Sequence, residues 1–191
     1  MKSKKYTDII DAAQRLFYKY GIKKVSIEEI CSEGNVSKMT FYKFFPNKTE
    51  LAKTVLDKVF DNAIKQFTDL MESDLPFSEK MHGLLMMKMK STKDANWAFI
   101  VELYKNSDNE LLAHAQHKIQ NTLNLVVDYF KQAQDKGWMR KDLSPTLMLV
   151  ILDKMQEMSL DDRVIAAYSD MQVAAMEITK FFLYGIFDER I

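Results

Sequence analysis

The segment from Ser37 to Phe45 carries the clearest chemical signal in this chain. Its polar side chains are Lys38, Thr40, Tyr42 and Lys43. Phe41 and Phe45 lie four positions apart and share one face of a helix, so the polar groups point elsewhere. Ammonium and hydroxyl groups donate hydrogen bonds to base edges and to phosphate oxygens. The segment therefore predicts a short helix that is anchored by aromatic rings and presents hydrogen-bond donors to a nucleic acid.

Other chemistry has weaker support in the sequence. His114 and His117 are three positions apart, a spacing that could hold a metal on a helix, but no third ligand is evident nearby. Cys31 is the single cysteine, which excludes an internal disulfide or a cysteine metal cluster. The chain has no glycine-rich phosphate loop, no G-x-S-x-G motif and no coherent Cys/His set. We therefore expect no enzyme, no cofactor and no bound metal.

Charge is distributed unevenly along the chain. The formal net charge is zero, but residues 1–53 contain 11 Lys and Arg against 6 Asp and Glu. The excess of five positive charges is offset by an equal negative excess in the remainder. Such an asymmetry indicates either a surface that attracts nucleic acid or an ordinary solvated basic surface, so the motifs must decide between them.

The first fifty residues contain the start and stop signals of three helices. Apolar positions recur at helical spacing from Ser3 to Tyr20, and Gly21 is suited to end that helix. Ser26 and Glu29 form an S-x-x-E capping box that predicts the start of a second helix. Asn35 tolerates the left-handed conformation and marks the tight turn before the third helix. These elements predict a helix-turn-helix.

The run from Gly21 to Leu51 resembles the N-terminal signature of the TetR/AcrR family of regulators. This resemblance implies that the third helix reads DNA in the major groove and that flanking residues bind phosphates. Phe41 and Phe45 match core positions of the signature. The residues that we assign to DNA contacts are Ser26, Ser37, Lys38, Met39, Thr40, Tyr42, Lys43, Phe44 and Lys48.

Three positions depart from the family pattern: Asn35 and Met39 stand where glycine is usual, and Phe44 stands where histidine is common. These departures affect the base preference and not the fold. The assigned residues also have plainer interpretations. Tyr42 could be a half-buried core aromatic, Lys48 could merely lie near a helix start, and the other polar groups could face solvent.

A long helix is predicted to connect the helix-turn-helix to the rest of the chain. Asn47 and Glu50 form a second capping box, and apolar positions continue to about Met71 without glycine or proline. We expect a helix-turn-helix domain in residues 1–46. We expect a helical ligand-binding and dimerisation domain in residues 47–191, with the long helix as the lever between them.

The remaining sequence predicts a helical bundle. With only 5 Gly and 3 Pro, the chain has few of the residues that hairpins and sheets need. A long helix ends at Gly137, and the following connector resembles the one before the penultimate helix of the family. There Ser144 is a candidate N-cap and Pro145 suits the first helical position. The predicted fold is all-α with about nine helices in total.

The last two long helices, near Pro145 to Met158 and Ser169 to Phe187, are more apolar than the surface of a monomer requires. We therefore predict a dimer interface of paired helices, although packing within one chain would give the same pattern. The assigned interface residues are Leu147, Ile151, Ala174, Ala175, Ile178, Phe181, Phe182 and Gly185.

Thirteen methionines are many for 191 residues, and some are clustered in the C-terminal part of the chain. Flexible thioethers can line an adaptable pocket for an apolar ligand, but they also fill ordinary cores. The candidate pocket residues are Met86, Met89, Trp97, Phe99, Tyr104, Met148 and Met155.

These features predict a cytoplasmic homodimer that represses transcription by binding a palindromic double-stranded DNA operator. The resemblance implies release by a small apolar or amphipathic effector. No apolar run approaches the roughly 20 residues that span a bilayer, so we expect no membrane partner. Two alternatives stay open: a DNA-binding regulator without a small-molecule effector, and a helical ligand carrier or cryptic enzyme that no longer binds DNA.

Overall fold

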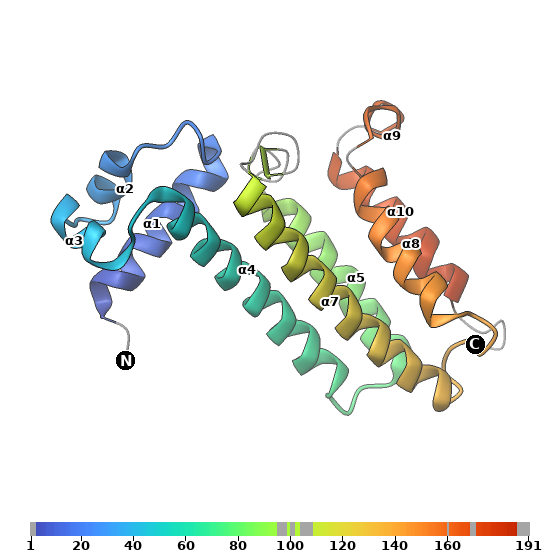
Figure 1. Ribbon diagram of the computed structural model, residues 1–191. Helices are drawn as coiled ribbons and strands as arrows, with labels where there is room; N and C mark the ends of the chain where they lie inside the picture. The colour runs from blue at the N-terminus through green and yellow to red at the C-terminus, as the bar shows by residue number, and fades with distance from the viewer. Residues whose placement is uncertain are drawn as a thin grey trace. The chain divides into compact units, whose positions relative to one another are not determined.

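The structure of the protein is a computed structural model that describes residues 3–94, 99, 102–103, 109–159, 161–168 and 171–186. Within those residues, every regular element is a helix, which confirms the predicted all-α fold (Figure 1). The helices are α1 (Lys4–Tyr20), α2 (Ile27–Glu33), α3 (Lys38–Phe44), α4 (Lys48–Met71), α5 (Phe77–Asp94), α7 (Asn109–Asp135), α8 (Pro145–Met158), α9 (Asp162–Ala166) and α10 (Met171–Ile186).

The chain divides into two compact units. The first combines Met1–Ala63 with Ala95–Lys118, and the second combines Ile64–Asp94 with Ile119–Ile191. The division passes through α4 and α7, so each of these helices contributes residues to both units. The first unit is therefore larger than the helix-turn-helix domain that we predicted from the sequence.

The local signals of the helix-turn-helix act as predicted. The Ser26 side chain accepts from the Glu29 backbone N–H, and the Glu29 carboxylate accepts from the Ser26 backbone N–H, which completes the capping box. Asn35 has a φ of 48°, in the left-handed region, and Gly21 ends α1 with a φ of 81°. The turns between the first three helices are thus fixed by residues within them.

Close packing between α1 and α2 depends on small residues. A Cβ atom at Gly34 would lie 3.3 Å from the Asp8 carbonyl oxygen and 3.4 Å from the Ala12 Cβ. Cys31 is also buried in the same core. The short contact allows α2 to pack against α1, and α3 then rests on this pair through its buried face.

The parts of α4 and α7 in the first unit run parallel and are joined by polar pairs. Each pair is 57 residues apart: Lys53 with Glu110, and Asp57 with His114 at 2.9 Å. Lys118 also lies 2.8 Å from Asp57. Partial burial opposes ionisation of Asp57, but the hydrogen bonds from Lys118 and His114 prevail and lower the pKa of its carboxyl. These pairs fix the register of α4 against α7.

The second unit has its own apolar core. Its buried members include Met81, Val127, Phe130, Met148 and Phe182. The predicted end of α7 is confirmed by Gly137, whose φ is 73°. Pro145 does occupy the first turn of α8. Ser144 is the N-cap residue of α8, as predicted, and its backbone carbonyl accepts from the Met148 N–H at 3.0 Å, while its side chain makes no capping hydrogen bond.

Candidate nucleic-acid interface

Helix α3 has one buried face and one exposed face. Phe41 and Phe45 are almost completely buried in the core of the first unit. Met39 is 83% exposed, Tyr42 is 54% exposed, and Lys43 is also exposed. Positions 39, 42 and 43 lie on adjacent turns of one helix, so the three side chains form a continuous surface, which we call the α3 face. The aromatic anchors and the outward donors thus separate as predicted.

Four other predicted contacts take part in the fold of the motif. The Ser37 hydroxyl caps α3 by accepting from the Thr40 backbone N–H at 3.1 Å, and the two hydroxyls lie 3.0 Å apart. The Ser26 hydroxyl serves the capping box described above. Phe44 is half-buried, with its ring edge-on to Tyr6 at 5.6 Å. Phe44 therefore packs against α1, and its assignment to DNA contacts stays a prediction.

The two lysines of α3 differ in their surroundings. The Lys38 ammonium forms an ion pair with Glu28 of α2, and this hydrogen bond is the main cause that lowers the pKa of the Glu28 carboxyl. Both side chains are exposed. Lys43, by contrast, has no ion-pair partner among the residues that the structure describes. Lys43 is therefore the better placed of the two to meet a phosphate or a base.

Replacing Glu28 with Gln is expected to strengthen non-specific DNA binding. The change removes a negative charge next to the α3 face and frees Lys38 to neutralise a phosphate. The slope of log affinity against log salt should become steeper by up to about 0.9 per subunit. Fluorescence anisotropy over a salt series measures this slope, and Glu79→Gln on α5 is the control. An unchanged slope would show that Lys38 stays away from the DNA.

Lys48 is positioned differently from the prediction. Its ammonium donates to the backbone carbonyls of Ile22 and Val25 at 2.8 Å and of Lys23 at 3.3 Å. An ammonium has three N–H donors, so these contacts use all of them. Burial lowers the pKa of Lys48, against the opposing charges of Glu102 and Glu29. We therefore assign Lys48 to fixing the loop between α1 and α2, instead of direct phosphate contact.

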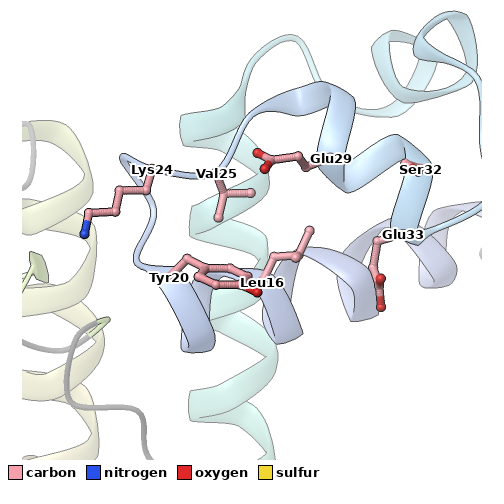
Figure 2. Close-up of a pocket in the computed structure, with 7 residues that line it drawn as sticks. All are labelled: Leu16, Tyr20, Lys24, Val25, Glu29, Ser32 and Glu33. Atoms are coloured by element: carbon pink, nitrogen blue, oxygen red, sulfur yellow. The ribbon is translucent and has the colours of Figure 1, made fainter.

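A hollow of about 490 Å³ lies beside this loop, between the end of α1 and α2 (Figure 2). Its lining residues are Leu16, Tyr20, Lys24, Val25, Glu29, Ser32 and Glu33. Both carboxylates already have partners, since Glu29 caps α2 and Glu33 accepts from Arg15 at 2.9 Å. Two carboxylates against the single ammonium of Lys24 leave the lining with net negative charge, which does not favour a phosphate.

The candidate pocket residues do not gather in one place. Trp97 and Tyr104 lie outside the described residues. Phe99 is buried in the first unit, where its ring lies 5.3 Å from that of Tyr18. The remaining members belong to the second unit, where Met148 is fully buried. Met155 is partly buried there, and Met86 and Met89 are exposed. The effector pocket thus stays a prediction.

The residues predicted for the dimer interface differ in their exposure, and the interface itself stays a prediction. Ala174, Ala175 and Phe182 are buried in the core of their own chain and cannot contact a second copy. Ile151 and Ile178 are half-buried. The described part of α10 instead exposes Phe181, Tyr184 and Gly185, and α8 exposes Leu147 and Val150. Val150 and Tyr184 are also exposed on these helices, each three residues after a predicted member, but they were not among the predicted residues.

The described residues contain neither a metal-holding cluster nor a helix able to cross a membrane. No cluster of three or more His, Cys, Asp or Glu side chains that could hold a metal occurs there. The helices in that part of the chain are also not long and apolar enough to cross a membrane. His114, one of the two histidines considered for a metal, instead pairs with Asp57 at 2.9 Å and so takes part in the contacts between α4 and α7.

Comparison with known proteins agrees with this geometry. Residues 9–55 match the family model described as bacterial regulatory proteins, tetR family. Two relatives from Bacillus subtilis are HTH-type transcriptional regulators. YvkB is 26% identical over 93% of this chain and 95% of its own length, and YhgD is 26% identical over 68% and 66%.

A similar solved structure is the transcriptional regulator FadR from Bacillus subtilis in complex with stearoyl-CoA. It is 18% identical, with a TM-score of 0.73 over 95% of this chain and 99% of that one, which shows a shared fold. The matched segment includes α2, α3 and the residues that anchor them. The helix-turn-helix segment of the chain therefore matches the TetR family of bacterial transcriptional regulators, and the whole chain shares the fold of FadR.

Proposed function

We propose that the protein represses transcription as a homodimer whose two α3 helices bind the half-sites of a palindromic operator. The α3 face carries this proposal, because it presents Met39, Tyr42 and Lys43 outward while Phe41 holds the helix in the core. The first 53 residues also carry the positive charge that attracts a phosphate backbone. The bases read in each half-site would follow from these side chains.

Dimer formation is supported by the exposed apolar surface of α8 and α10. Phe181 is 84% exposed and Tyr184 is 72% exposed, on a helix that is otherwise strongly apolar. Large aromatic side chains in such positions are typical of protein interfaces. Two identical surfaces pair most simply about a twofold axis, and a twofold protein requires a palindromic operator.

Release by a small apolar or amphipathic effector is the second part of the proposal. The fold can hold such a molecule, since the related FadR structure contains stearoyl-CoA. In this chain α4 begins next to α3 and continues into the second unit, so a change there could alter the first unit. Inverting a preference of 99 to 1 needs a differential affinity of about 5.5 kcal/mol. We place these events in the cytoplasm.

Selection of bound duplexes from a random DNA pool tests the operator. A palindromic consensus is expected, and Lys43→Gln should weaken binding to it by about a hundredfold, because both subunits lose a contact worth about 1–3 kcal/mol. Lys65→Gln, on the exposed surface of α4, is the matched control and should bind normally.

Binding measurements with the selected duplexes distinguish the proposed function from its two alternatives. A regulator without a small-molecule effector would bind the consensus but would not be released by stearoyl-CoA or other apolar compounds. A ligand carrier would select no sequence and would show no salt-dependent DNA affinity. Failure to enrich any sequence at low ionic strength would overturn the proposed function.

A further inference from the structure

Met39 stands out on the α3 face by its chemistry. All seven residues of α3 are described, and Met39 is the one aliphatic side chain among them that is largely exposed, at 83%. The methyl group of Thr40 is less available, because Thr40 is half-buried and hydrogen-bonded to Ser37. Lys43 lies one turn after Met39 on the same side. An apolar group and a cationic donor are therefore presented together.

The chemistry of the major groove indicates what an apolar group in this position would contact. Hydrogen-bond donors and acceptors line the base-pair edges there, and the one methyl group they present is the C5-methyl of thymine. On the basis of the function proposed above, we propose that Met39 selects thymine at one position of each half-site by packing its thioether against that methyl group. Lys43 would meet a guanine or a phosphate one helical turn away.

Partners other than a thymine methyl group fit the exposed Met39 side chain less well. The basic excess of residues 1–53 makes a nucleic acid the complementary partner for this surface. Removing an exposed methionine from water stabilises the complex only where an apolar group meets it, since a polar base edge would lose its own hydration. The long, unbranched side chain can also adapt to the position of the methyl group.

Uracil substitution tests this inference, because uracil differs from thymine only by the missing methyl group. In duplexes of the selected operator, each thymine is replaced by uracil in turn, and affinity is measured by fluorescence anisotropy. Wild-type protein should bind about fourfold more weakly when the contacted thymine is replaced in one half-site, the effect of one buried methyl group. Replacement in both half-sites should weaken binding by about fifteenfold.

Met39→Ala should bind thymine and uracil equally at that position and respond as wild type at the others. Met39→Leu should keep most of the discrimination, and Lys43→Gln should keep all of it while losing affinity. Because Met39 is exposed, these variants are expected to keep the wild-type melting temperature, which circular dichroism checks.

Two results would overturn the inference while leaving the operator proposal intact: wild-type protein insensitive to uracil at every position, or Met39→Ala with unchanged discrimination. A protein that selects no operator would refute the proposed function itself. The two failures are therefore distinguishable.

Discussion

Phe181→Asp is expected to convert the proposed dimer into a folded monomer. Phe181 is 84% exposed in the single chain, so an aspartate there meets water and leaves the monomer core intact. In a twofold dimer the substitution acts twice, removing two buried aromatic rings that contribute about 2–3 kcal/mol each. The dimer dissociation constant should rise by at least about a thousandfold. Sedimentation equilibrium over a concentration series measures the change.

The neighbouring residue provides a matched control. Phe182 is only 6% exposed, and its ring centroid lies 6.2 Å from that of Phe130 in the core of the second unit. Phe182→Ala should lower the free energy of unfolding by about 3–5 kcal/mol, the usual cost of a cavity of that size. Phe181→Asp should leave the melting temperature of the monomer unchanged. A variant that stays dimeric would place the interface elsewhere.

Lys48→Met is expected to destabilise the loop between α1 and α2. The substitution keeps an unbranched side chain only one atom shorter but removes the hydrogen bonds from an ammonium to three carbonyls, two of them in partly buried contacts. The loss of these charged hydrogen bonds, which leaves the carbonyls without donors, should lower the free energy of unfolding by about 3 kcal/mol. Thermal unfolding gives the total loss, and hydrogen exchange shows whether the loop amides lose protection first.

Lys65→Met is the control for Lys48→Met. Lys65 lies on the same helix, but it is exposed and paired with Asp69, so its replacement should leave stability nearly unchanged. The salt dependence of DNA binding by Lys48→Met then distinguishes a role of Lys48 in fixing the loop from direct contact with a phosphate. If the folded variant keeps the wild-type loop protection but its salt slope is shallower by about 0.9 per subunit, Lys48 contacts a phosphate directly.

Glu102 connects the same loop to the segment near Leu103. Its carboxylate accepts from the Lys23 backbone N–H at 2.6 Å and lies against Gly21, where a Cβ atom would meet it at 2.1 Å. Gly21 is therefore required for a second reason besides its positive φ. Nothing local to Gly21 in the sequence indicates this partner, since the two residues are 81 positions apart.

The helix-turn-helix could be predicted from the sequence because its signals are local. A capping box needs two residues three apart, and a left-handed turn needs one tolerant residue such as Asn35. The alternation of Phe41 and Phe45 with polar residues similarly fixed which face of α3 is buried. The start of α8 could also be predicted, since the preference of Pro145 for the first helical turn is a local property.

The tertiary structure alone decided the roles that depend on distant partners. Lys48 meets carbonyls 23 to 26 residues away, and no local pattern distinguishes that arrangement from a phosphate contact. On α10 nearly every position is apolar, so hydrophobic periodicity cannot tell the exposed Phe181 from the buried Phe182. The sequence determined where helices begin, end and turn. Packing of residues far apart in the chain determined which side chains stay exposed on α3 and α10.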